Sequence, residues 1–268
     1  MSSGIHAPIG VFDSGVGGLS ILQALRAEMA HEPFIYIADS GHAPYGERDE
    51  AHVLARSRAI VAYLVGRNVK ALVIGCNTAT AGAIERLRGE HPKLALIGVE
   101  PALKPAVALS TTGHIGVMAT RGTLASAKFK TLLAAQADRT VFVLQPCDGL
   151  ADAVERGDTT EIIALCAQYT SAMGSFGTKP GQIDTLVLGC THYPFAAAQL
   201  RAMLEPDVRF IDNGQAVARQ TRRVIATSAR TAAAVGSVSL LTTGNPEILR
   251  TAARRWLGLT TEVGLLRI

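Results

Sequence analysis

The stretch Ile9-Gly-Val-Phe-Asp-Ser-Gly-Val-Gly-Gly18 places four apolar residues directly before an Asp-Ser pair and a run rich in glycine. The apolar residues predict a short buried β-strand, and the glycines allow a tight turn into a following helix. A strand that ends in such a turn is typical of the βαβ unit of a parallel sheet. The stretch therefore indicates an α/β fold with polar groups at the carboxyl end of the strand.

Further apolar, β-branched runs follow along the chain, and helix-like segments separate them. The strand candidates are residues 9–12, 34–37, 71–74, 96–99, 115–118, 141–144, 186–188, 209–211 and 238–241. Strands that alternate with helices in this way predict a mainly parallel sheet. In such a sheet, ligands bind beyond the carboxyl ends of the strands.

The strand pattern also contains a repeat. Two pairs of matching segments are 106 residues apart, namely Ile9-Gly-Val with Ile115-Gly-Val and Ile35-Tyr-Ile with Val141-Phe-Val. Two more pairs are 114 residues apart, namely Gly75-Cys76 with Gly189-Cys190 and Ile97 with Ile211. Matching elements in the same order predict two similarly wound halves.

We therefore expect an α/β fold of two pseudo-symmetric, doubly wound domains with mainly parallel sheets and an active-site cleft between them. The last strand and helix, residues 238–257, follow the second half and are expected to return to the first domain. The expected first domain is discontinuous and comprises residues 1–99 and 210–268. The second comprises residues 100–209.

Composition limits the class of protein. The chain has 268 residues, with 26 Lys and Arg against 22 Asp and Glu, so its net charge is a mild +4. No apolar run approaches the roughly 18 residues of a membrane-spanning helix, and the first residues lack the pattern of a secretion signal. We expect a soluble, cytoplasmic protein with no membrane or nucleic-acid partner.

One group of basic residues leaves an alternative open. Arg219, Arg222, Arg223 and Arg230 have helical spacing. This spacing describes either a solvated helix face or a phosphate-binding stripe, and the scattered distribution of charge favours the solvated face.

Four cysteines are present, and none forms a Cys-x-x-Cys pair, so reduced thiols are expected. Cys76 and Cys190 each follow a glycine at the end of an apolar strand, and the repeat makes their positions equivalent. A lone buried cysteine is usually a small apolar core residue. Two cysteines at symmetric strand ends, followed by the small polar residues Asn77, Thr78 and Thr191, instead indicate chemistry.

Two thiols suit one reaction especially well. A thiolate on one side of a carbon acid can remove its α-proton while a thiol on the opposite side delivers another proton. This inverts the stereocentre without a cofactor or a covalent intermediate. His192 lies two residues after Cys190 and can tune that thiol or bind substrate, whereas a metal site lacks a clear fourth ligand.

Asp13 and Ser14 have two open interpretations, and the two remaining cysteines carry a weaker signal for a functional role. Asp13 and Ser14 either cap a tight turn or bind a zwitterion, with Asp13 pairing with an ammonium group and the turn N–H groups with a carboxylate. Cys147 follows a strand end and is a possible cleft residue. Cys166 lies in a helix-like segment and is expected to pack in the core.

The motifs together resemble those of the cofactor-independent glutamate racemases. They are Gly10-Val-Phe-Asp-Ser-Gly-Val-Gly-Gly18, Ala38-Asp-Ser40, Ala43-Pro-Tyr-Gly46, Gly75-Cys-Asn-Thr-Ala79 and Leu188-Gly-Cys-Thr-His-Tyr-Pro194. They occur in the order of that family, and the similarity spans residues 9–213.

The resemblance implies that Cys76 acts on D-glutamate and Cys190 on L-glutamate, with no cofactor and no metal. Asp13 and His192 match residues thought to assist the thiols. The residues matching substrate-binding positions are Asp13, Ser14, Tyr45, Gly46, Asn77, Thr78, Thr191 and His192, with Thr120 as a further carboxylate ligand. It also implies a homodimer that supplies D-glutamate for peptidoglycan.

One segment departs from the family pattern. After Cys147 the family shows proline and a hydrophobic run, whereas here Asp148-Gly-Leu-Ala-Asp-Ala-Val precedes Glu155. Glu155 keeps the family spacing, so it is either an auxiliary residue of the site or a charge on a helix surface.

Two alternative functions remain at this point. The first is racemisation of aspartate or another 2-substituted acid, because side-chain specificity depends on the shape of the cleft. The second is a non-catalytic regulator that binds an anion at the glycine-rich turn. Two symmetric cysteines count against a regulator.

Overall fold

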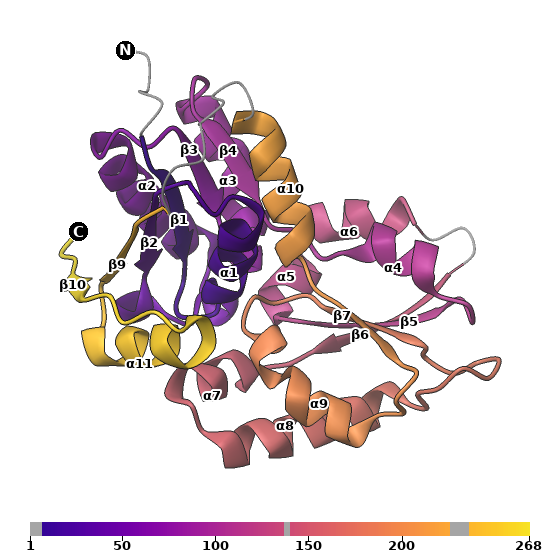
Figure 1. The fold of residues 1–268 in the computed structure, drawn as a ribbon. Coiled ribbons are helices and arrows are strands. Elements are labelled where there is room, and N and C mark those ends of the chain that lie inside the picture. Colours follow the sequence, from indigo (N-terminus) through magenta and orange to yellow (C-terminus); the bar gives the residue numbers. More distant parts are fainter. Residues whose placement is uncertain (1–6, 137–139, 226–235) are drawn as a thin grey trace. The chain divides into compact units, whose positions relative to one another are not determined.

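The computed structural model describes residues 7–136, 140–225 and 236–268. Two compact units divide the chain. One contains the described residues up to Val99 together with those from Gly214 to Ile268, and the other contains Glu100–Asn213. Both units combine parallel strands with helices, so the expected α/β class is confirmed (Figure 1).

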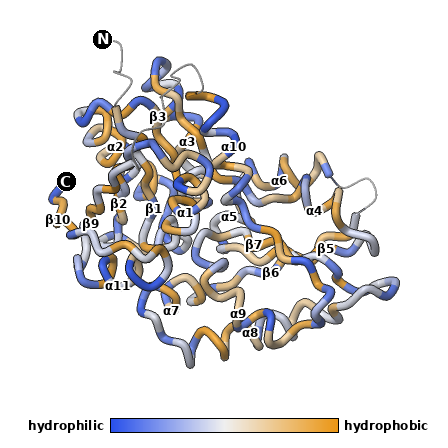
Figure 2. The backbone as a smooth tube through the Cα atoms, viewed as in Figure 1, coloured by the Kyte–Doolittle hydropathy of each residue, from blue (hydrophilic) through white to orange (hydrophobic). Residues whose placement is uncertain are grey.

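The sheet of the first unit is parallel at every described pairing. Its strands lie in the order β10 (Val263–Leu265), β9 (Val238–Thr242), β2 (Phe34–Ala38), β1 (Ile9–Asp13), β3 (Ala71–Ile74) and β4 (Ala95–Gly98). Every residue of β1, β2 and β3 is buried. Near-continuous apolar strands of this kind belong to a parallel sheet covered on both faces, and the hydropathy can be followed in Figure 2.

The helices of the first unit form two groups. The first group is α1 (Leu19–Glu28), α10 (Gly214–Ile225) and α11 (Pro246–Leu257), in which α1 contacts both others, and the second is α2 (Glu50–Gly66) with α3 (Asn77–Glu90). Two short helical turns, η1 (Ser40–His42) and η2 (Tyr45–Glu47), follow β2. Side chains of α2 and α3, among them Ile60, Leu64 and Ile84, pack with Phe12 and Ile74 of the sheet.

The sheet of the second unit is also parallel at every described pairing. Its strands lie in the order β6 (Val141–Pro146), β5 (His114–Ala119), β7 (Thr185–Leu188) and β8 (Arg209–Ile211). The accompanying helices are α4 (Leu103–Leu109), α5 (Arg121–Ala125), α6 (Ala127–Ala134), α7 (Leu150–Arg156), α8 (Thr159–Met173), η4 (Tyr193–Ala196) and α9 (Ala197–Met203).

The two sheets share one topology. The order β2-β1-β3-β4 of the first corresponds to β6-β5-β7-β8 of the second, which agrees with the repeat found in the sequence. Gly10 and Gly116 occupy the same place in the two central strands. A Cβ at Gly10 would lie 3.1 Å from Leu64 of α2, and one at Gly116 would lie 2.6 Å from Met173 of α8. The glycines thus let a helix approach each sheet closely.

The register of one repeat pair was wrong. Gly10 pairs with Ile35, whereas Gly116 pairs with Val143, so the counterpart of Ile35 is Val143 and not Val141. Side chains alternate between the two faces of a strand, so a shift of two residues leaves each side chain on the same face. An apolar pattern alone does not distinguish these two registers.

The chain leaves the second unit close to β8. The expected first domain resumes at residue 210, whereas β8 pairs with β7 through Ile211 and the second unit runs to Asn213. From there α10 leads to β9, which pairs with β2. The edge strand β10 was not predicted, because it has three residues and two of them are exposed.

Helix α10 presents its basic residues to solvent. Val217, Ala218 and Thr221 are buried, whereas Arg219, Arg222 and Arg223 are exposed. Figure 2 shows both hydrophilic and hydrophobic residues along this helix. This pattern favours the solvated helix face over a phosphate-binding stripe; Arg230 lies outside the described residues.

Within the described parts of the chain, helices that are both long and apolar enough to span a membrane do not occur.

Candidate active site

The turn after β1 is held by Asp13. The backbone N–H of Gly18 donates to Oδ2 of Asp13 at 2.5 Å, and the Ser14 hydroxyl donates to Oδ1 at 3.5 Å. A Cβ at Gly18 would lie 2.5 Å from Cβ of Asp13 and 2.9 Å from the Tyr36 hydroxyl, so only glycine fits there. The bond from the Gly18 N–H to Asp13 therefore closes the turn. The same carboxylate also accepts the Ser14 hydroxyl.

Cys76 caps the N-terminus of α3 and is separated from β3 by Gly75. Its sulfur accepts a hydrogen bond from the Ala79 N–H at 3.4 Å and donates one to the Ser14 hydroxyl at 3.7 Å. A thiolate at the first turn of a helix is stabilised by the helix dipole and by the free N–H groups. Cys76, Ser14 and Asp13 thus form a continuous chain from a thiol to a carboxylate.

The remaining candidates of the first unit lie in two segments. Asn77 and Thr78 occupy the first turn of α3, and Asn77 is buried. Tyr45 is also buried and belongs to the same core cluster as Cys76, while Gly46 follows it in η2. The structure therefore brings Asp13, Ser14, Tyr45, Gly46, Asn77 and Thr78 into the neighbourhood of Cys76.

Cys190 has the equivalent position in the second unit. The N–H of Gly189 donates to the Met118 carbonyl at 2.7 Å, just as the Gly75 N–H donates to the Phe12 carbonyl at 2.7 Å. Each thiol thus follows a glycine that is bonded to the central strand of its own sheet. The predicted equivalence of the two Gly-Cys turns is therefore present in the backbone.

Cys190 lies beside an imidazole and a carboxylate. Its sulfur is 3.6 Å from Nδ1 of His192, and Nε2 of His192 is 2.8 Å from Oε1 of Glu155. Burial by itself lowers the pKa of His192, but its contacts with Cys190 and Glu155 outweigh burial and raise that pKa well above its usual range. The arrangement favours an imidazolium ion between the Cys190 sulfur and the Glu155 carboxylate.

Glu155 comes from α7, whose start is marked by Gly149 with a left-handed φ of 78°. Its side chain is 14% exposed and faces His192, so it is not a charge on the helix surface. The altered segment before Glu155 therefore still delivers a carboxylate to the site.

Thr120 and Thr191 occupy less direct positions. Thr120 is the second-unit counterpart of Ser14, and its hydroxyl accepts the Thr123 N–H at 3.3 Å as the cap of α5. Thr191 lies between Cys190 and His192 in the sequence, and its side chain is buried.

The other two cysteines are both buried. Cys147 follows β6, its thiol donates to the Gln145 carbonyl at 3.4 Å, and burial raises its pKa. Cys166 is fully buried in α8, and burial raises its pKa to about 11. The predicted core role of Cys166 agrees with this burial, and both thiols are held in the neutral form.

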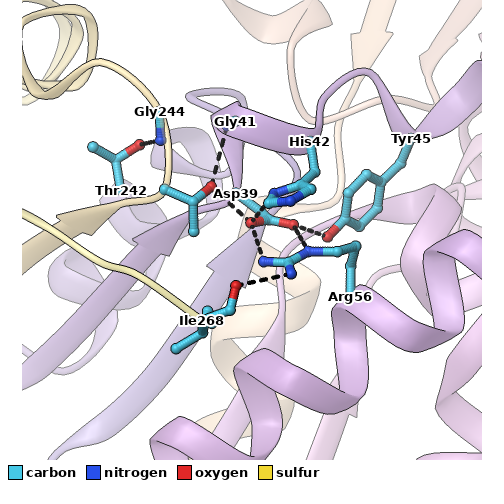
Figure 3. A network of polar contacts seen from close by, with 9 residues as sticks. Asp39, Gly41, His42, Tyr45, Arg56, Thr242, Gly244 and Ile268 are labelled. Atoms are coloured by element: carbon cyan, nitrogen blue, oxygen red, sulfur yellow. Dashed lines mark hydrogen bonds and ion pairs between the residues drawn. The ribbon is translucent and has the colours of Figure 1, made fainter.

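A network of polar side chains surrounds Asp39, and it was not predicted from the sequence. Asp39 begins the loop after β2, within the Ala38-Asp-Ser40 motif. Its carboxylate contacts Tyr45 and Arg56 (Figure 3) and also Thr243. Arg56 and Thr243 lie far from Asp39 in the sequence, and no local motif marks them. Only the pairing of β9 with β2 and the packing of α2 bring them together.

Groups of three or more His, Cys, Asp or Glu side chains that could hold a metal ion do not occur among the described residues.

Comparison with known proteins gives consistent results. The family model described as Asp/Glu/Hydantoin racemase matches residues 19–221. A glutamate racemase of Stutzerimonas stutzeri is 46% identical over 82% of this chain and 82% of its own length. A glutamate racemase of Methylococcus capsulatus is 46% identical over 82% of this chain and 80% of its own length.

Solved structures agree in fold over nearly the whole chain. A glutamate racemase isoform from Bacillus anthracis is 30% identical with a TM-score of 0.86, covering 99% of both chains. The Escherichia coli glutamate racemase, solved with L-glutamate and an activator, is 30% identical with a TM-score of 0.82, covering 98% of this chain and 99% of its own. The chain therefore belongs to the Asp/Glu/hydantoin racemase family, and within it to the glutamate racemases.

Proposed function

We propose that the chain interconverts L- and D-glutamate by transferring protons between the substrate α-carbon and two thiols, Cys76 and Cys190. The observation that carries this proposal is the equivalence of the two Gly-Cys turns, each of which is bonded to the central strand of its own sheet. A core residue has no need of such a match in both halves.

The reaction from L- to D-glutamate begins with Cys190 as the thiolate. It removes the α-proton and becomes a thiol, and the electron pair of the broken C–H bond stays on the α-carbon. Cys76, as a thiol, then gives its proton to the opposite face and becomes a thiolate. The reverse reaction starts from the opposite protonation states, so neither thiol forms a covalent bond to the substrate.

Each thiol has a separate partner for its proton. Cys190 can transfer its proton to Nδ1 of His192, and Glu155 balances the resulting positive charge. Cys76 can pass its proton to Ser14 while Ser14 passes its own to Asp13. In the first case an imidazolium ion stabilises the thiolate, and in the second the N-terminus of α3 does so.

The remaining candidates would hold the substrate. We assign this role to Ser14, Asn77, Thr78, Thr120 and Thr191, with Asp13 and His192 close to the ammonium and carboxylate groups. The hydroxyl of Tyr45 is bonded to Asp39, so Tyr45 and Gly46 would contribute backbone groups. Small hydroxyl and amide groups of this kind bind a dicarboxylate without competing with the thiols for its α-proton.

The substrate can be identified with protein that has been stripped of small molecules. It is incubated in deuterated water with L-glutamate and, separately, with L-aspartate. With glutamate, we expect the optical rotation to be lost and deuterium to be incorporated at the α-carbon. Exchange with aspartate alone would reassign the substrate, and exchange with neither acid would contradict a racemase.

We also propose a cytoplasmic homodimer that supplies D-glutamate for peptidoglycan. The cytoplasm suits two thiols that must remain reduced, because disulfides rarely persist there. The homodimer and the peptidoglycan role follow from the resemblance to the family. Sedimentation velocity tests the homodimer, since a mass of 28.1 kDa for the active species would contradict it.

A further inference from the structure

The carboxylate of Asp39 is fully buried and surrounded by hydrogen-bond donors (Figure 3). The Tyr45 hydroxyl donates to Oδ2 at 2.5 Å, and the Thr243 hydroxyl donates to Oδ1 at 2.7 Å. Nδ1 of His42 lies 3.2 Å from Oδ1. A buried carboxylate with this many contacts has one orientation, because every change of angle costs a hydrogen bond.

Arg56 sets that orientation. Its Nε donates to Oδ2 of Asp39 at 3.0 Å and its Nη2 donates to Oδ1 at 2.9 Å, so the planar guanidinium binds both oxygens at once. The Arg56 side chain is 13% exposed, far less than a surface arginine. Burial raises the pKa of Asp39, but the hydrogen bonds from Arg56, Tyr45 and Thr243 outweigh it, so the carboxyl is ionised.

Two further segments of the chain hold Arg56 and Thr243 in place. Nη1 of Arg56 donates to the backbone carbonyl of Ile268 at 3.1 Å. The hydroxyl of Thr243 accepts the Gly41 N–H at 3.1 Å. Arg56 therefore connects α2, the loop after β2 and the segment after β10 through one planar group.

The network reaches the candidate site through Tyr45. Oδ2 of Asp39 accepts from both Arg56 and Tyr45, so a shift of the guanidinium moves the atom that holds the Tyr45 hydroxyl. The Tyr45 ring packs in the same buried cluster as Cys76 and Ala79, at the first turn of α3. The position of the Tyr45–Gly46 backbone thus depends on where Asp39 holds the ring.

We infer that Arg56 is a positioning residue, which acts through Asp39 to hold Tyr45 and the following peptide where the substrate binds. This inference rests on the proposed function, because Tyr45 and Gly46 are substrate-binding residues only if the chain acts on glutamate. Arg56 binds Asp39 and the Ile268 carbonyl, and we assign it no part in proton transfer.

Arg56→Lys tests the inference because lysine keeps the charge but cannot bind both carboxylate oxygens in one plane. We expect the KM for glutamate to rise about tenfold with a change in kcat of less than about threefold, since substrate positioning is altered and the thiols are not. Tyr45→Phe should raise KM in the same way. The double variant should be no worse than the more affected single variant, because both changes break one path.

Arg58→Lys is the matched control. Arg58 lies on the same helix and also binds a carboxylate with Nε and Nη2, but that carboxylate is Glu90 and the Arg58 side chain is 51% exposed. It should leave KM unchanged. Thermal unfolding of each variant shows whether it is folded at the assay temperature.

Three results would overturn the inference. They are an unchanged KM in Arg56→Lys, multiplication of the two single effects in the double variant, and an equal rise of KM in Arg58→Lys. If the unsubstituted protein does not racemise glutamate, the proposed function fails instead, and the two failures are distinguished by that first assay.

Discussion

Nε2 of His192 lies 2.8 Å from Oε1 of Glu155, with both side chains largely buried. Cys190 lies on the other side of the same imidazole. The second thiol is therefore paired with an imidazole and a carboxylate, whereas the first is paired with a hydroxyl and a carboxylate. The two halves share a backbone plan but differ in the groups that hold the proton.

Glu155→Gln tests this difference through the pH dependence of the reaction. Glu155 raises the pKa of His192, so its loss lowers that pKa, and the imidazolium ion disappears at a lower pH than in the unsubstituted protein. The basic limb of the kcat/KM profile for L-glutamate should therefore move to lower pH.

Asp152→Asn is the control for that substitution. Asp152 lies on the same helix and pairs with Arg156 at the surface, where its side chain is 50% exposed. Its removal should leave the pH profile in place. A profile that does not move in Glu155→Gln would separate Glu155 from the function of His192.

Replacing either thiol should nearly abolish racemisation. A positioned acid or base contributes about 10²- to 10⁴-fold, so Cys76→Ser and Cys190→Ser should each lose at least about 10²-fold in kcat/KM. L- and D-glutamate have equal free energies in water, so each variant must lose kcat/KM equally in the two directions. Polarimetry from either enantiomer measures this.

Cys166→Ser serves as the comparison for the two thiol variants. Cys166 is buried in α8 and belongs to neither thiol group, so racemisation should continue at nearly the parental rate. The buried hydroxyl should lower the free energy of unfolding by about 1–3 kcal/mol. A Cys190→Ser protein as active as Cys166→Ser would rule out the two-base assignment.

Gly18→Ala should damage stability and activity together. The added Cβ would lie 2.5 Å from Cβ of Asp13, so Asp13 must move away from the Gly18 N–H and from Ser14. We expect a loss of about 1–3 kcal/mol in the free energy of unfolding and a lower kcat. Denaturant unfolding and initial rates measure the two effects.

Gly89→Ala provides the opposite result for the same chemical change. Gly89 lies in α3, and a Cβ there would meet nothing within 4 Å. Alanine should stabilise the protein by about 0.5–1 kcal/mol because it favours helix more than glycine does. Equal effects of the two substitutions would contradict a special role for the turn after Asp13.

Local sequence was sufficient for the described strands other than β10 and for the equivalent positions of the two Gly-Cys turns. Each Gly-Cys pair follows a buried apolar run, and the topology of a parallel sheet requires that run to end where ligands bind. Glu155 could be proposed from its spacing, but its contact with His192 depends on how α7 packs. The left-handed Gly149 that begins α7 gives no separate signal of that contact.

Other features depend on tertiary structure. The pairing of Gly116 with Val143 differs by two residues from the expected register, and such a shift preserves the alternation of side chains. The contact of Arg56 with Asp39 joins a helix to a loop 17 positions earlier. An arginine on a helix usually faces solvent, so its burial could not be read from its neighbours in the sequence.

The central claim is that one thiol serves each face of the α-carbon, and the first turnovers in deuterated water test it most directly. L-glutamate is the starting material, and both enantiomers are recovered and examined by mass spectrometry. We predict that newly formed D-glutamate carries deuterium at the α-carbon while the remaining L-glutamate keeps its protium. D-glutamate that retains the original proton would indicate a single base and contradict the account.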